Sequence, residues 1–275
     1  MMRAPEEEFA AASLDTFRAA VSELEKAVRN IRAVWDGLIQ AVQEMVAAVR
    51  GKLDASWWGA VVAWFSDDVK DVLKSIENIL TEAGLKVAEI LDRLERSVNG
   101  AVPVRSLFTV ALDWSTKVNT TLSKIVPDVQ QSGDIDSWHG PAHATYLIRE
   151  NEQEKAADHV TEAVKEISLW LSEVGVANVD FIANLFAQAG QVIEKIVEVT
   201  ADVTVVTTTA DPLSAQETIN DLAASLGRFA SNITTYLGTL GSRLAEVVGM
   251  VTEIAAVHSD SRDFPGGDWP SAVKA

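Results

Sequence analysis

The chain has no cysteine, and it lacks several other features that mark familiar classes of protein. Without thiols it cannot form disulfides, use a thiolate as a nucleophile or hold zinc through thiolate ligands. Its N-terminus, Met1 to Glu8, is acidic and has no apolar core segment, so no cleaved signal peptide is expected. The sequence also has no unbroken run of about 18 apolar residues, and no membrane-spanning helix is expected.

Basic residues are scarce, because 23 Lys and Arg stand against 40 Asp and Glu, for a formal net charge of −17. A nucleic-acid binder needs a positive surface to displace phosphate counterions, so nucleic acid is not an expected partner. A basic patch for anionic lipid is disfavoured for the same reason, and membrane contact, although left open, is not expected. The acidity suits a soluble surface whose copies repel one another.

The chain is rich in long helical patterns. Hydrophobic residues make up 48% of it, and only 7 Pro and 15 Gly interrupt them. Over the first 50 residues, apolar side chains recur in alternating steps of three and four, a seam of about five heptads that requires a facing helix. The seam residues are Leu14, Phe17, Val21, Leu24, Val28, Ile31, Trp35, Leu38, Val42, Met45 and Val49.

Two further helices are predicted in the first half of the chain. The pattern resumes over 62–98, and Asn99-Gly100 with Pro103 just beyond is expected to end that helix. Gly84 lies inside it and weakens it. The next helix runs over 107–125 and should kink or end before Pro127.

The second half predicts a helix over 146–174 and a last helix that begins at the capping-box pattern Ser214 to Glu217, after a break at Asp211-Pro212. Between them, 179–209 keeps helical spacing, but 199–205 also alternates like a strand. Length and continuity favour helix. The same Val- and Thr-rich stretch, 192–209, could instead be a concealed membrane-active segment; a buried helix is the simpler interpretation.

These patterns predict an all-α fold: an elongated bundle of about six long helices in successive antiparallel hairpins. The predicted domains are a first hairpin over 1–100, a second over 101–177, a third helix pair over 178–258 and a flexible tail over 259–275.

One short motif occurs at both predicted hairpin corners. In Asp136-Ser137-Trp138-His139-Gly140-Pro141, Gly140 suits a helix cap and Pro141 the first helical residue. Asp54-Ala55-Ser56-Trp57-Trp58-Gly59 repeats the order acid, Ser, Trp, any residue, Gly, and Gly267 to Ser271 is a partial third copy. A single copy could be an ordinary loop, but repetition of a corner is a stronger signal.

Trp138-x-Gly140, followed by Ala142 and Tyr146, resembles the Trp-x-Gly helical hairpin family, the early-secreted-antigen-like substrates of bacterial type VII secretion. The first copy, Trp57-x-Gly59, is similar but looser. The resemblance covers about residues 7–98 and 104–175 and is weak over 179–258. It implies two antiparallel helices with Trp-x-Gly at each bend. Because members are usually one hairpin long and pair as dimers, this chain is similar to a tandem or fused form.

The family's export signal is Tyr, three residues, then an acid. Tyr146 and Glu150 match its letters, although the signal lies beyond the second helix in single-hairpin members. The alternative is that Tyr146 simply packs in the core.

We find no catalytic constellation in the sequence and expect no enzyme activity, cofactor or metal. His139 and His143 are four residues apart, but no acid lies between them and no third ligand is near, so solvated corner histidines are the simpler interpretation. The acidic clusters are typical of solvated faces.

The resemblance therefore implies a protein that is exported without a cleaved leader to the surface or medium and acts through other proteins, as substrate, carrier or surface assembly component. Its implied partners are a secretion ATPase and either a paired helical-hairpin protein or itself. The alternatives are a helical pore-forming toxin, the amino-terminal trafficking region of a secreted toxin, and a cytosolic coiled-coil scaffold.

Overall fold

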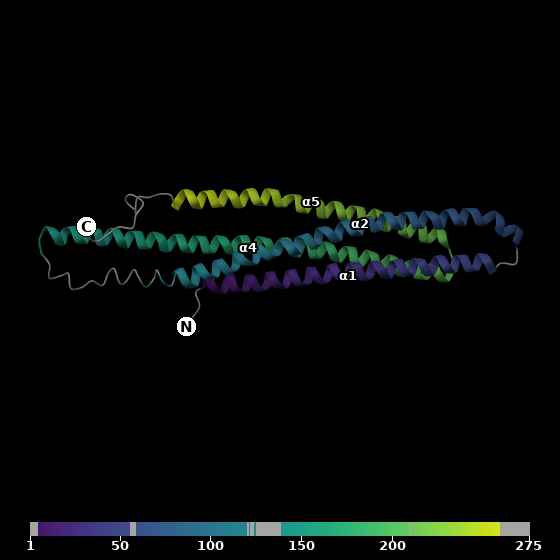
Figure 1. The fold of residues 1–275 in the computed structure, drawn as a ribbon, viewed down its shortest axis with the longest axis horizontal. Coiled ribbons are helices and arrows are strands. Elements are labelled where there is room, and N and C mark those ends of the chain that lie inside the picture. The colour runs from purple at the N-terminus through teal and green to yellow at the C-terminus, as the bar shows by residue number, and fades with distance from the viewer. Residues whose placement is uncertain are drawn as a thin grey trace. The chain divides into compact units, whose positions relative to one another are not determined.

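The structure is a computed structural model that describes residues 5–55, 59–119, 121, 124, 139–209 and 211–258. Nearly all of these residues are helical, and no strand occurs among them. The elements are α1 (Pro5–Ala55), α2 (Gly59–Asp113), a short π-helix η1 (Trp114–Asn119), α4 (Pro141–Thr209) and α5 (Pro212–His258) (Figure 1). The predicted all-α class is confirmed, and the described residues hold four long helices in place of about six.

The heptad seam of α1 is confirmed as its buried face. Nine of its eleven residues are buried, and only Val21 and Trp35 are half-buried. The strict alternation of three- and four-residue steps keeps these side chains on one side of the helix, where neighbouring helices cover them.

The predicted end of a helix at Asn99-Gly100 is wrong, because α2 runs through these residues and through Pro103. A proline inside a helix removes one backbone hydrogen bond and disfavours the helix locally. Here the buried residues Ala101, between Gly100 and Pro103, and Phe108, beyond Pro103, continue the helical spacing. Burial of that face outweighs the local preference, so the predicted third helix is the end of α2 and η1.

The predicted separation between 174 and 179 is also absent, since α4 is one helix from Pro141 to Thr209. The helical interpretation of 179–209 is confirmed and the strand alternative is wrong. The buried residues there are spaced by three and four, as a helix requires: Val192, Ile196, Val199, Val203 and Val206.

Helix α5 begins earlier than predicted. Pro212 is its first residue, and the Asp211 carboxylate caps it by accepting from the backbone N–H of Leu213 at 3.2 Å and of Ser214 at 3.5 Å. The predicted capping box at Ser214 is therefore wrong. Asp211 supplies the acceptor for the backbone N–H groups of the first turn, and Pro212 has a φ that is already helical. Ser214, two residues further on, cannot improve this start of the helix.

The described chain divides into two compact units, and each long helix contributes residues to both. Unit 1 takes its described residues from 1–18, 102–179 and 241–275, and unit 2 from 19–101 and 180–240. The domain ranges predicted from the sequence stay a prediction.

Unit 1 is built around Phe108, which is fully buried. Its ring lies 5.7 Å from that of Phe17, at an interplanar angle of 42°. The ring also lies directly over Gly175, where a Cβ would come within 2.2 Å of its Cζ. Nearby, the buried hydroxyl of Ser168 donates to the Ala111 carbonyl at 3.0 Å and joins α4 to α2.

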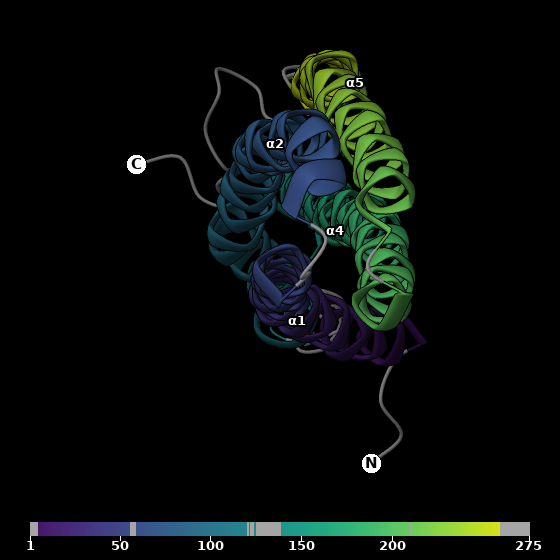
Figure 2. The same ribbon diagram turned by 90° about the vertical axis from the view of Figure 1, so that its right-hand side faces the viewer.

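In unit 2, segments of all four long helices pack together (Figure 2). Arg32 of α1 pairs with Glu95 of α2. Phe181 of α4 and Tyr236 of α5 stack at 5.1 Å with their rings 10° from parallel. Besides these two contacts, unit 2 has a core of buried aliphatic side chains.

Candidate functional site

The second Trp-x-Gly corner is described only from His139 onward, and Trp138 lies outside the described residues. Gly140 has a φ of +103°, a conformation that L side chains rarely adopt. Its carbonyl accepts from the Ala144 N–H at 3.3 Å, and Pro141 is the first residue of α4. The predicted roles of Gly140 as cap and Pro141 as first helical residue are confirmed.

The first corner is described less completely. Trp57 lies outside the described residues, and Gly59 is the first residue of α2. The partial third copy, around Trp269, lies outside them as well. The glycines of both complete copies therefore stand at the start of a long helix, which is where the motif predicts them.

Tyr146 and Glu150 lie one turn apart on α4 in unit 1, and both are half-buried. Their four-residue spacing places them on the same side of the helix. Half-burial is compatible with either interpretation of Tyr146, as export element or as packing residue, so its role stays a prediction.

His139 is exposed just before α4, and His143 is half-buried in its first turn. Within the described part of the chain, no group of three or more His, Cys, Asp and Glu residues lies close enough to hold a metal ion.

A groove between α1 and α2 was not predicted from the sequence. It lies within unit 2 and has a volume of about 640 Å³. Its lining is mostly apolar or uncharged, with one cation and one anion at its edge. The lining residues are Trp35, Ile39, Val42, Gln43, Val46, Ala47, Arg50, Glu77, Leu80, Thr81 and Gly84.

Trp35 and Gly84 shape this groove together. A Cβ at Gly84 would lie 3.3 Å from Cζ2 of Trp35, so the absent side chain lets the indole settle against α2. The break signal at Gly84 thus marks a close approach between two helices. The sequence does show Gly84 in one predicted helix and Trp35 in the seam of another. Recognising that they meet requires the register between α1 and α2, which the sequence does not supply.

The other end of the groove carries a loose ion pair. Arg50 Nη2 and Glu77 Oε1 are 3.4 Å apart, and their side chains are 62% and 58% exposed. An exposed pair of this kind contributes little to stability, because water screens it. Arg50 and Glu77 can therefore each pair with another charged group at a small cost in free energy.

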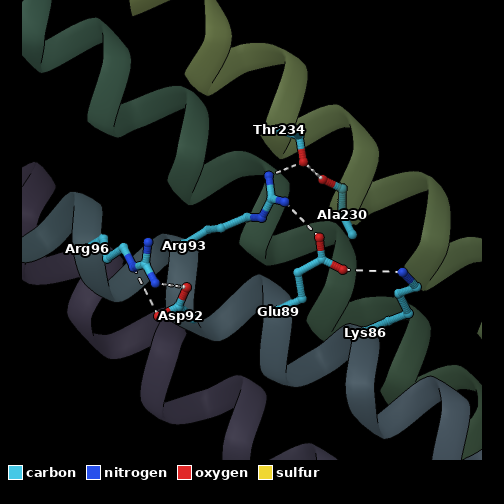
Figure 3. Close-up of polar contacts among 7 residues, drawn as sticks. All are labelled: Lys86, Glu89, Asp92, Arg93, Arg96, Ala230 and Thr234. Carbon is cyan, nitrogen blue, oxygen red and sulfur yellow. Dashed lines mark hydrogen bonds and ion pairs between the residues drawn. The ribbon is translucent and has the colours of Figure 1, made fainter.

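A polar ladder joins α2 to α5 on another side of unit 2 (Figure 3). The Glu89 carboxylate is 3.2 Å from Lys86 Nζ and 2.7 Å from an Arg93 nitrogen. Arg93 also donates to the Thr234 hydroxyl, which donates in turn to the Ala230 carbonyl at 2.6 Å. These contacts connect α2 to α5.

The electrostatics of the ladder suit a structural role. Hydrogen bonding from Lys86 holds the pKa of the Glu89 carboxyl below its ordinary value of 4.5, and the charge of Arg93 acts in the same direction. A general base works best with a pKa near the operating pH, whereas the pKa of Glu89 is lowered, away from neutral pH.

One described helix, α4 over Pro141–Thr208, is long and apolar enough to cross a membrane by length and composition. Only 33% of its most apolar 18-residue window is buried. The sequence predicted no such helix because it has no unbroken apolar run, and sufficient length and mean hydropathy do not require one. Core helices of soluble proteins have the same length and composition.

No protein-family model, curated protein or solved structure matches this chain.

Proposed function

We propose that the protein is exported by a type VII-like secretion system and acts without catalysis, through contacts with other proteins, as substrate, carrier or surface assembly component. The observation that carries the proposal is the position of two glycines. Gly59 is the first residue of α2, and Gly140 directly precedes α4 with a positive φ. Each belongs to a Trp-x-Gly sequence, and a glycine at the start of a long helix is what a helical hairpin with Trp-x-Gly at its bend implies.

The groove between α1 and α2, whose lining is mostly uncharged, and the long helices supply surface for such contacts. An amphipathic helix can lay its apolar face into a groove of this kind, anchored by a large aromatic such as Trp35. The proposed partners are a secretion ATPase and either a paired helical-hairpin protein or a second copy of the chain. The proposed location is the cell surface or the medium.

Export is tested in the native host by deleting the secretion ATPase and measuring the protein in culture medium, with a cytosolic enzyme as lysis control. We expect the protein to accumulate inside the cells. Undiminished protein in the medium of the deletion strain, without the lysis marker, contradicts the proposal.

The corner is tested with Trp138→Gly. We expect nearly unchanged helix content by circular dichroism, but weaker export or partner binding, because the ring is proposed to be recognised rather than buried. Wholesale loss of helicity would assign the ring to the core. Trp114→Gly, in η1 and away from any Trp-x-Gly sequence, is the matched control for losing a Trp.

A helical pore former is the second candidate, favoured by the apolar, largely unburied window in α4. Dye-loaded zwitterionic liposomes test it at micromolar protein, at neutral pH and at low pH, where the carboxylates lose their charge. Dye release that grows with protein concentration supports the pore former, and intact liposomes at both values remove it.

A further inference from the structure

In unit 2, α4 has a second apolar face besides the one that it buries. Its residues recur in steps of three and four, and at about 100° per residue they fall within about 80° of one another around the helix. All of them are uncharged, and none is buried. We call this the outer face; it extends over about 37 Å at 1.5 Å per residue. It consists of Ala183, Phe186, Gly190, Ile193, Val197, Ala201, Thr204 and Thr208.

The outer face is distinct from the buried face of the same helix. The buried residues Leu185, Ile196 and Val203 lie about 120° away from it around the helix. Packing within unit 2 leaves Phe186 40% exposed and Val197 49% exposed, so the core of the unit does not account for these large apolar side chains. An exposed helical surface is ordinarily filled by Ala, Glu, Lys, Gln and Arg, and β-branched residues there lower the helix propensity.

The threonines do not make the outer face polar. The Thr204 hydroxyl donates to the Thr200 carbonyl at 2.8 Å, and the Thr208 hydroxyl donates to the Val205 carbonyl at 2.7 Å. Both acceptors belong to α4 itself. A partner can therefore cover these residues without leaving a buried donor unpaired, and the cost of removing water from the face is low.

The charged residues of this part of α4 all lie to one side of the outer face. Segment 180–209 holds the acids Asp180, Glu194, Glu198 and Asp202 against the single base Lys195, an excess of three negative charges. Glu194 and Glu198 are exposed and lie nearest to the face, about 60° and 100° from its midline. Lys195 Nζ is 3.0 Å from Glu198 Oε1. The other edge of the face passes into the buried residues of α4, so only one edge is acidic.

This acidic edge decides what the outer face can bind. Two copies of α4 paired antiparallel through the face would place their acidic edges side by side, and like charges oppose such a pair. In a parallel pair, each acidic edge would meet the edge along which the other α4 packs into its own unit. Helices that lie on membranes carry basic residues beside their apolar face, the opposite of what is found here. We propose that the outer face docks an amphipathic helix of another protein, whose apolar seam is flanked by Lys and Arg.

Such a helix fits the outer face in shape as well as in charge. The three- and four-residue spacing of the face is what a second helix needs to pack its own seam alongside. Gly190 has no neighbour within 4 Å of where its Cβ would be, and Phe186 and Ile193 are its neighbours along the face. The glycine thus leaves a hole that an apolar side chain of the partner can enter. Lys and Arg beside that side chain would reach Glu194 and Glu198.

Binding is tested with two synthetic helical peptides of about 26 residues, enough to cover the face at 1.5 Å per residue. Both have Leu and Ala at the seam positions; one has Lys at the flanking positions and the other has Glu. Fluorescence anisotropy against the full chain is measured in about 0.15 M salt, where the Debye length is only about 8 Å. A single-helix contact is smaller than the roughly 1,600 Å² of a standard interface, so we expect the Lys peptide to bind at about micromolar concentration. The Glu peptide should bind at least about tenfold more weakly. Equal binding of the two peptides overturns the proposal.

Val197→Glu places the contact on the outer face. It adds a negative charge in the middle of the apolar seam and should weaken binding of the Lys peptide at least about tenfold. Gln191→Glu is the matched control, because Gln191 is exposed on the same helix about 120° away, on the acidic side, and the net charge changes by the same amount. It should bind the peptide equally well or more tightly. Circular dichroism checks that both variants keep their helix content. Unchanged binding in Val197→Glu contradicts the proposal.

A second pair of variants tests the acidic edge. Glu194→Lys combined with Glu198→Lys should weaken the Lys peptide at least about tenfold and strengthen the Glu peptide, because the edge changes sign. The control combines Glu217→Lys with Asp221→Lys, two exposed acids on α5 of the same unit, and makes the same change in net charge. It should have a much smaller effect. If the two double variants lose the same affinity, the peptide follows only the net charge of −17, and the proposed site is wrong.

The other possible occupants give different results. Sedimentation velocity of the chain alone should show no pairing through this face; a mass that rises toward twice the 29.7 kDa of one chain and that Val197→Glu restores to one chain would assign the face to a second copy. Binding to zwitterionic vesicles that Val197→Glu abolishes would assign it to a membrane. Either result overturns the proposal. None of these measurements depends on export, so the proposed function can fail while this inference holds, and the reverse.

Discussion

The two units of the chain bury different kinds of side chain. Of the twelve largest fully buried side chains in the described residues, ten lie in unit 2, and all ten are Leu, Ile or Met. The other two, Phe17 and Phe108, lie in unit 1 and contact each other. Unit 2 thus distributes its burial along aliphatic seams, whereas unit 1 concentrates it in an aromatic pair.

The glycines reflect the same difference. Gly175 in unit 1 is required by a ring that occupies its Cβ position, while Gly190 in unit 2 has no neighbour within 4 Å of that position. A core that depends on one large ring has few ways to adjust, whereas an aliphatic seam can redistribute small losses over many contacts. The substitutions below test this difference.

Phe108→Ala should have the largest effect. Removing a fully buried ring costs about 3–5 kcal/mol in the free energy of unfolding, because transfer and cavity terms add. Hydrogen exchange should rise over 102–118 and 141–175 much more than over 185–233. A uniform rise over the whole chain would show that the two units unfold as one.

Gly175→Ala comes next, with an expected loss of about 1–3 kcal/mol from overpacking, measured by urea unfolding. The new Cβ would lie between 2.2 and 2.8 Å from three atoms of the Phe108 ring. In Phe108→Ala the same change should be nearly harmless, because the obstructing ring is gone. Additive losses in the double variant would refute this packing account.

Gly190→Ala should instead stabilise the protein by about 0.5–1 kcal/mol, since it gains helix propensity without a clash. Gly84→Ala should gain less, because the new Cβ meets Trp35 at 3.3 Å and the indole must shift. Thermal unfolding of the two variants beside the parent protein gives the comparison. A larger gain at Gly84 than at Gly190 would show that the indole moves freely.

The smallest expected effect concerns Glu89. Its carboxyl has a lowered pKa in the folded state, so the stability that its charge contributes is present above the ordinary pKa of 4.5 and is lost as the pH falls below it. Because the group is partly exposed, the contribution is small. Glu89→Gln should therefore differ slightly from the parent in melting temperature near neutral pH and converge with it at low pH. A difference that grows on acidification has the wrong sign for this explanation.

Sequence reasoning identified the helical class and the buried face of α1 because both depend on spacing along a single helix. It also identified Gly140 and Pro141 as a helix start, since capping is decided by adjacent residues. It misjudged Pro103 and Ser214, where a local signal competed with packing or with a better cap nearby. It missed the groove, because Trp35 and Gly84 are brought together only by the register between two helices.

The order of residues alone thus determined where apolar faces run and which residues start helices, through steric and hydrogen-bonding preferences that act within one turn. Tertiary structure alone decided that α2 continues past Gly100 and Pro103, that Phe108 rests on Gly175, and which outward face of α1 is left with a groove. Those outcomes depend on burial between segments far apart in the chain. The free energy of that burial exceeds the preference of any single residue for ending a helix.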